Sequence, residues 1–265
     1  MQLQILLGIY AAVLGLIVGS YLNVVIYRLP RGISTVLPRS RCPECGELIR
    51  PLDNVPVVSF LLLGGRCRAC RARISWRYPL IELATAALFV ACLLRFGVTF
   101  AAAAGALFCA LMLVLAVIDI EHMILPDALT WPGILLGILL QPLLPWARWG
   151  GGPWSPFLGA VAGALLGGGV LLAVWLIWYL VRREEGMGLG DVKMLALIGA
   201  FLGWKGVLVA LFIAALSGAA VGLTLMALGS LGAKSKLPFG AFLAFGGLTA
   251  LFAGEPLVRA YARLL

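Results

Sequence analysis

Two aspartates stand at the ends of long apolar segments, where a charged side chain is costly and marks a functional site. Asp119 follows Val117 and Ile118, and Asp191 closes the turn Gly188-Leu189-Gly190. Two carboxylates held close together cannot both ionise easily, so they share a proton, and such a pair activates water in aspartic proteolysis. The glycines should give positive φ angles and close backbone approach, which would let an extended peptide reach the carboxylates.

Helix capping is the simpler role for an isolated aspartate. Asp191 would in that case cap a short helix that starts at Val192. Asp127 follows Pro126 and precedes an apolar run, so we expect it to cap the helix that begins there.

Four cysteines form a second group of residues that could have a chemical role. Cys42, Cys45, Cys67 and Cys70 make two Cys-x-x-Cys pairs separated by 21 residues, the spacing of a structural zinc site with four thiolate ligands. A polar loop of this length has little apolar surface, so a bound metal would supply folding free energy. Two disulfides, an iron–sulfur site or a redox role are the alternatives. Cys92 and Cys109 fall in apolar runs and should be small buried hydrophobes.

The composition indicates a membrane protein that positions these groups with helices. Hydrophobic residues make up 63% of the 265 residues, charged residues only 12%, and the mean hydropathy is +1.08, whereas soluble domains carry about 25% charge. We predict an all-α polytopic membrane protein with about eight transmembrane helices and a small cytoplasmic zinc-binding module. Apolar runs predict spans near 4–27, 79–96, 100–118, 129–145, 157–181, 192–203, 206–230 and 239–255.

Basic residues orient the predicted spans. Lysines and arginines are retained on the cytoplasmic side, and placing residues 28–78 there puts 15 of the 20 on that side. Both aspartates then lie near the cytoplasmic face. The net charge of +9 is therefore a topology signal, and without aromatic or base-reading residues among the basic ones we predict no nucleic-acid partner. The lipid bilayer is the expected surroundings.

Several motifs, in order along nearly the whole chain, resemble the type IV prepilin peptidases. They are Gly19-Ser20-Tyr21-Leu22-Asn23-Val24 with Arg28-Leu29-Pro30, the cysteine loop with Asp53-Asn54-Val55-Pro56 between its halves, Arg77-Tyr78-Pro79-Leu80-Ile81-Glu82, Leu125-Pro126-Asp127 after Asp119, Gly188-Leu189-Gly190-Asp191, and Pro238-Phe239-Gly240-Ala241-Phe242-Leu243.

The resemblance implies a bifunctional enzyme of the bacterial inner membrane that serves type IV pili and type II secretion. It implies that Asp119 and Asp191 are the catalytic pair, the latter in the family's GxGD motif. The substrates would be prepilins and pseudopilins, cut on the cytoplasmic side after the Gly that ends a short basic leader. A second activity would methylate the new N-terminal residue with S-adenosylmethionine. The implied domains are a first helix at 1–27, a four-cysteine zinc module at 28–78 and a membrane-embedded peptidase domain at 79–265.

The site of the methyl donor is not evident in the sequence. No glycine-rich dinucleotide-binding fingerprint follows a strand pattern, so the cofactor must bind by other means. Glu82 and Asn23 are candidates for cofactor binding. Glu82 is equally well explained by an ion pair with Arg77, and Asn23 by a hydrogen bond between helices.

Three alternatives to the bifunctional enzyme remain open. The first is a peptidase without methyltransferase activity. The second is a proton-coupled transporter, in which lone membrane carboxylates carry protons; it predicts inverted repeats, and we find no convincing internal repeat. The third is a structural scaffold, which leaves the Gly-x-Gly-Asp turn unexplained.

Overall fold

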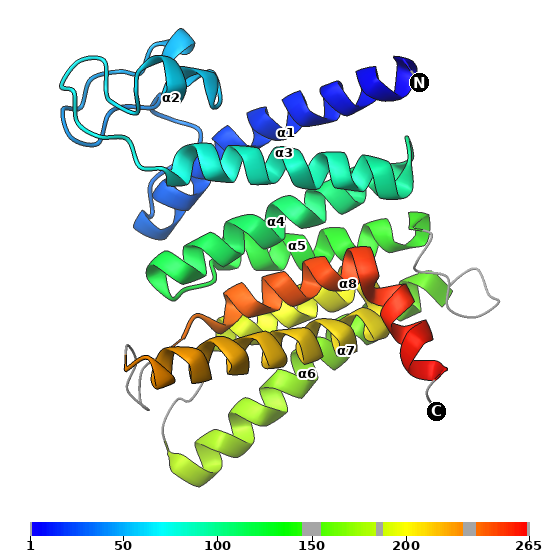
Figure 1. The fold of residues 1–265 in the computed structure, drawn as a ribbon. Coiled ribbons are helices and arrows are strands. Elements are labelled where there is room, and N and C mark those ends of the chain that lie inside the picture. The colour runs from blue at the N-terminus through cyan, green and yellow to red at the C-terminus, as the bar shows by residue number, and fades with distance from the viewer. Residues whose placement is uncertain (1, 145–154, 184–187, 230–236, 264–265) are drawn as a thin grey trace. The chain divides into compact units, whose positions relative to one another are not determined.

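The computed structural model describes residues 2–144, 155–183, 188–229 and 237–263. These residues form helices and loops (Figure 1). The β-structure among them consists of two isolated β-bridges. The helices, with η marking 3₁₀ turns, are α1 (Gln2–Arg28), η1 (Leu29–Arg31), η2 (Pro51–Asn54), α2 (Val58–Leu62), α3 (Arg77–Phe96), α4 (Phe100–His122), α5 (Asp127–Leu140), η3 (Gln141–Leu143), α6 (Ser155–Arg182), α7 (Leu189–Ala227) and α8 (Phe239–Ala262). The prediction of an all-helical membrane protein is confirmed.

The chain divides into two compact units, residues 1–114 and 115–265. The first unit holds α1, the cysteine loop, α3 and most of α4. The second holds the end of α4, with Asp119, and α5 to α8. Both aspartates therefore belong to the second unit, and the four cysteines belong to the first.

Six helices in the described part of the chain are long and apolar enough to cross a membrane, namely α1, α3, α4, α6, α7 and α8. The predicted span 129–145 corresponds to α5 and η3, a shorter apolar helix over Asp127–Leu143. Helix α7 has 39 residues, or about 58 Å at 1.5 Å per residue, nearly twice the thickness of a bilayer core. It includes the predicted span 192–203 and most of the span 206–230, since α7 ends at Ala227. The ends of the predicted spans at 145 and 230 lie outside the described residues.

Gly203 breaks α7 between these two predicted spans. Its φ of 68° and ψ of −176° are not helical, and Figure 1 draws the parts before and after it as separate helical segments. With its amide nitrogen turned toward α7, the buried Gln141 donates to the carbonyls of Ala200 and Phe201 at 2.7 and 2.8 Å. These carbonyls precede the break, so Gln141 satisfies acceptors that the helix leaves open.

Small residues let the helices of the second unit approach closely. A Cβ at Gly199 of α7 would lie 2.1 Å from the carbonyl oxygen of Gly163 in α6, and a Cβ at Gly246 of α8 would lie 2.2 Å from that of Ala210 in α7. Contacts of this kind are typical of helix packing in membranes, where van der Waals contact drives association. They fix the ends of α7 and α8 that carry the candidate site.

Helices α1 and α3 of the first unit pack by the same means. A Cβ at Gly15 would lie 2.5 Å from the Cα of Ala86, and a Cβ at Gly19 would lie 2.7 Å from the Cα of Glu82. The buried Asn23 adds a hydrogen bond from its side-chain nitrogen to the Tyr78 carbonyl, at 3.1 Å. The interhelical role considered for Asn23 is thus present.

This packing predicts that Gly19→Leu destabilises the first unit. The leucine Cβ would meet α3 backbone, and overpacking of this kind costs about 1–3 kcal/mol, so the unfolding temperature of the purified protein should fall by several degrees. Gly8→Leu on the same helix is the matched control, because a Cβ there meets nothing within 4 Å. Equal unfolding temperatures for the two variants would contradict the α1–α3 contact.

Candidate active site and metal centre

Asp119 lies in the last turn of α4 and is buried, with 5% of its surface exposed. The helix ends three residues later, at His122, and Met123 takes a left-handed conformation with a φ of 55° while its N–H donates to the Asp119 carbonyl at 2.9 Å. The chain then turns through Leu125 into α5. This turn holds the carboxylate at the end of its helix, facing the starts of α7 and α8.

The start of α8 supplies the hydrogen bond that fixes Asp119. The backbone N–H of Ala241 donates to Oδ2 of Asp119 at 3.1 Å. Ala241 lies in the first turn of α8, where N–H groups have no partner within the helix and the helix dipole favours an anion. A Cβ on the preceding residue, Gly240, would lie 2.8 Å from the same oxygen. Glycine at this position therefore admits the carboxylate.

Asp191 lies in the first turn of α7 and is buried, with 8% of its surface exposed. The helix begins at Leu189 with Gly188 as its N-cap, and Gly188 has a φ of −73°. The expected positive φ is therefore wrong for Gly188, and it is wrong for the helical Gly190 as well. Close approach is confirmed at Gly190, where a Cβ would lie 2.9 Å from the Cβ of Leu125.

The structure brings the two aspartates together in the second unit. Their carboxylates lie close enough for Asp119 to act electrostatically on Asp191, and both are withdrawn from solvent. Leu125 joins the three helix ends, because its side chain meets both Gly190 of α7 and Gly240 of α8. Like charges held near each other in a buried site favour sharing of one proton.

The capping roles considered for the aspartates are wrong. Gly188, not Asp191, is the N-cap of α7, and Pro126, not Asp127, is the N-cap of α5. Asp127 instead forms an ion pair with Lys193, two residues beyond Asp191. The pair ties the start of α5 to the first turn of α7. Sequence reasoning missed this role of Lys193, because the partners belong to different helices.

The four loop cysteines form one cluster. Their sulfur atoms all lie within 4.8 Å of one another, and the sulfurs of Cys42 and Cys70 are 3.9 Å apart. Four sulfurs around a tetrahedral zinc at about 2.3 Å would lie about 3.8 Å apart. All four cysteines are free thiols, so the expected ligand set is assembled in a geometry that fits a metal ion. Cys92 and Cys109 are fully buried in the first unit, as expected.

Each Cys-x-x-Cys pair sits on the same kind of turn. Cys42 donates its N–H to Glu47 and accepts from Gly46, while Cys67 donates to Ala72 and accepts from Arg71, with all four distances between 2.8 and 3.1 Å. Gly46 and Arg71 occupy equivalent positions with φ of 73° and 62°. The backbone N–H groups of Cys70 and Ala69 lower the pKa of Cys67 to about 7, whereas burial and the neighbouring sulfurs raise the pKa of Cys70 to about 12. Cys67 is therefore the member of this pair that favours the thiolate.

An ion pair ties the segment between the two turns to the cluster. Arg68, inside the second Cys-x-x-Cys, donates to both oxygens of Asp53 in η2, at 2.8 and 2.6 Å for the shortest bond to each. This bidentate contact holds the pKa of Asp53 below its usual value and raises the pKa of Arg68. Because the Arg68 side chain is largely exposed and solvent screens its charge, the pair orients η2 more than it stabilises the fold.

Glu82 and Asn23, the candidates for cofactor binding, both hold structural contacts. The carboxylate of Glu82 accepts the backbone N–H of Val57 at 2.8 Å. Val57 has a φ of 60°, so this bond anchors a strained residue at the start of α2. Glu82 thus joins α3 and the cysteine loop.

Two family models match the chain. Residues 13–96 match the bacterial Peptidase A24 N-terminal domain, and residues 106–223 match the type IV leader peptidase family. No solved structure matches.

Curated relatives match over most of the chain's length. A protein from Burkholderia pseudomallei named prepilin leader peptidase/N-methyltransferase is 40% identical, with 93% of this chain and 85% of the relative aligned. Proteins of the same name from Pseudomonas aeruginosa and Myxococcus xanthus are 37% and 42% identical. The aligned shares are 94% and 91% for the former, and 87% and 67% for the latter.

The cysteine cluster predicts that the protein binds one metal ion through these four residues. Cys67→Ser removes one of four ligands, so the metal content measured by elemental analysis should fall from about one ion per chain to near zero. Cys109→Ser is the control, because this buried thiol lies in α4 and outside the cluster. Unchanged metal content in the Cys67 variant would remove that residue from the ligand set.

Proposed function

The chain belongs to the type IV leader peptidase family, and we propose that Asp119 and Asp191 carry its peptidase reaction. The family and the curated relatives give the two activities, prepilin leader peptidase and N-methyltransferase. One observation supports the assignment of the catalytic pair. Two buried carboxylates from α4 and α7 meet beside the first turn of α8.

In the proposed peptidase step the two carboxylates have different tasks. Asp119 accepts the N–H of Ala241 at a helix N-terminus, where negative charge is favoured, so it acts as the ionised member and takes a proton from water. Asp191 carries the shared proton and donates it toward the oxygen of the scissile carbonyl. The water that Asp119 deprotonates attacks the carbonyl carbon. When the C–N bond breaks, Asp119 passes that proton to the leaving amine, and the hydroxyl that Asp191 protonated returns its proton to Asp191 as the new carboxyl group forms.

The proposed substrates are prepilins and pseudopilins of the bacterial inner membrane. Their apolar helix would lie in the bilayer beside the enzyme, with the cleavage site after a Gly at the cytoplasmic face. The excess of lysine and arginine in the loops on that side supports this orientation. A small residue before the scissile bond suits a narrow site. In this site the backbone at Gly190 and Gly240 already packs directly against the side chains of Leu125 and Asp119.

Zinc is the proposed ion in the cysteine cluster, held by Cys42, Cys45, Cys67 and Cys70. Four thiolates close the coordination sphere, so the ion would have a structural task and leave no open position for catalysis. It would order the loop between α1 and α3, which has few buried apolar side chains of its own.

The methyltransferase reaction requires S-adenosylmethionine in this proposal. When bound, this donor supplies a methyl group to the nitrogen of the new N-terminus and leaves as a neutral thioether, while the proton lost by the nitrogen passes to solvent. A mass measurement of the mature product distinguishes the bifunctional enzyme from a peptidase alone.

Replacement of either aspartate should abolish leader cleavage. Asp119→Asn and Asp191→Asn keep the side-chain size but remove an acid or base, so the cleavage rate of a purified prepilin should fall by about a thousandfold or more. Glu255→Gln, at an exposed position of α8, should cleave at the normal rate. Processing retained in one aspartate variant would exclude that residue from the pair.

The contact of Asp119 with the start of α8 should also be needed for cleavage. In Gly240→Ala the new methyl group would displace a carboxylate oxygen that is 2.8 Å away, and a misplaced catalytic group costs about ten- to a hundredfold in rate. Gly254→Ala on the same helix is the matched control, since its nearest neighbour is 3.9 Å away. If both variants cleave equally fast, α8 does not position Asp119.

A further inference from the structure

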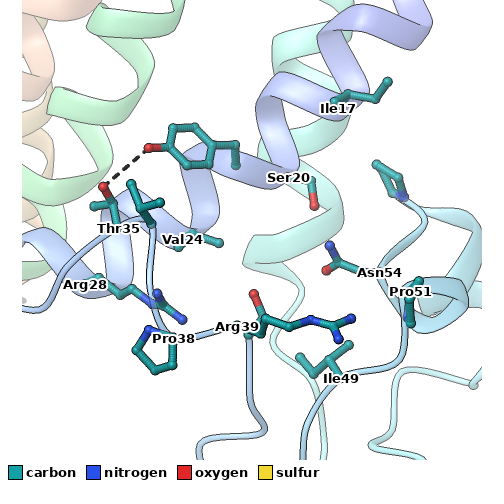
Figure 2. A pocket seen from close by; sticks show the side chains of 14 residues that line it. Ile17, Ser20, Val24, Arg28, Thr35, Pro38, Arg39, Ile49, Pro51 and Asn54 are labelled. Carbon is teal, nitrogen blue, oxygen red and sulfur yellow. Dashed lines mark hydrogen bonds between the residues drawn. The ribbon is translucent and has the colours of Figure 1, made fainter.

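The first unit contains a cavity of about 530 Å³ between the C-terminal third of α1 and the cysteine loop. Figure 2 shows Val24 and Arg28 of α1 on one side of it, and Arg39 and Asn54 of the loop on the other. The membrane-spanning segment that contains α1 ends at Arg31. The cavity therefore lies where this helix leaves the apolar core of a bilayer and reaches the level of the lipid headgroups.

The charge in this cavity is positive. Arg28 and Arg39 line it, and none of the other described residues that line it is acidic. The buried Arg28 donates from Nη1 to the Ser34 carbonyl at 3.0 Å, which holds its guanidinium in one orientation at the wall. Arg39 is exposed, so a ligand can reach its charge from outside. Because a guanidinium presents a fork of N–H groups that matches phosphate oxygens, the cavity favours a phosphate-bearing anion.

Neutral polar groups surround the two arginines. The hydroxyls of Thr35 and Ser40 and the amide of Asn54 line the same cavity, and each can donate or accept a hydrogen bond. A single phosphate would fill only a small part of the volume. The cavity thus has room, and suitable partners, for a glycerol group attached to the phosphate.

The cavity continues into an apolar face of α1 within the membrane-spanning segment. Ile17 and Tyr21 line it and each has half or more of its surface exposed. Tyr10 and Val13, one and two turns closer to the N-terminus, lie on the same face and are also largely exposed. A soluble anion would have no use for this face, whereas the acyl chain of a lipid would cover it.

We propose that the cavity binds the headgroup of an anionic phospholipid from the surrounding bilayer. Its phosphate would pair with Arg28 and Arg39, and an acyl chain would follow the exposed face of α1. Basic pockets at the end of a membrane span attract such headgroups, and each arginine adds to the attraction. Since the lipid would contact both α1 and the cysteine loop, it would hold this loop against the membrane surface.

The proposal is independent of the catalytic pair. The residues that line the cavity belong to the first unit, and both aspartates belong to the second. Failure of prepilin cleavage would therefore leave the lipid site untouched, and loss of the lipid site would leave the assignment of the aspartates untouched.

Lipid titration of the full-length protein in detergent, followed by native mass spectrometry, tests the proposal. Wild-type protein should bind phosphatidylglycerol at least about fivefold more tightly than phosphatidylcholine, whose headgroup has no net charge. Arg39→Gln should weaken phosphatidylglycerol binding about fivefold, and the double variant with Arg28→Gln about twentyfold or more. Arg73→Gln is the matched control, because this exposed arginine of the same loop does not line the cavity, and it should bind normally.

Unchanged binding of phosphatidylglycerol by Arg39→Gln would overturn the proposal. An equal loss in Arg73→Gln would overturn it as well, because it would show a general attraction to the basic loop without a defined site. Glycerol phosphate provides the headgroup without acyl chains, and its displacement of the lipid at equal concentration would assign the cavity to a soluble phosphate compound instead. If the double variant does not fold, Arg39→Gln decides alone, since its side chain is exposed.

Discussion

The candidate active site depends on the contact of one buried carboxylate with the start of a helix. Asp119 accepts the N–H of Ala241, and the absence of a side chain on Gly240 leaves room for it. Leu125 packs against the same glycine and against Gly190, so the ends of α4, α7 and α8 meet at one point. A charged group in such surroundings is costly unless backbone dipoles and a shared proton compensate for it. The second aspartate, Asp191, lies where these helix ends meet, in the first turn of α7.

The two units are ordered by different interactions. In the second unit, glycines bring helix backbones into contact, as between Gly163 and Gly199, and the exposed apolar side chains suit contact with lipid. The cysteine loop of the first unit has few such contacts and relies on its sulfur cluster, the Asp53–Arg68 pair and the anchor at Glu82. The cysteine loop thus forms the wall of a polar cavity that the helices alone would not provide. The two family models divide the chain earlier, between residues 96 and 106, than the two compact units, which divide at residue 114 within α4.

The sequence predicted what depends on local spacing, and it failed where distant helices meet. The cysteine spacing predicted the cluster, and the isolated Asp119 and Asp191 predicted a buried pair, since each residue type has few other uses in such positions. The expected cap at Asp127 was wrong because Pro126 already occupies that position and Lys193, from another helix, takes the carboxylate. The hydrogen bond from Ala241 crosses 122 residues of sequence. The family resemblance included the motif at residues 238–243, which contains Ala241. No spacing or periodicity in the sequence indicates that Ala241 would meet Asp119.

Cross-linking within the folded protein is the sharpest test of whether the two aspartates converge. In a chain with Asp119→Cys and Asp191→Cys, a short bifunctional thiol reagent followed by peptide mapping reports whether the two positions share one site. We expect a peptide that joins residues 119 and 191, and no joined peptide when the second cysteine is placed at Gly203 instead. Labelling of both cysteines without any link between them would contradict the convergence.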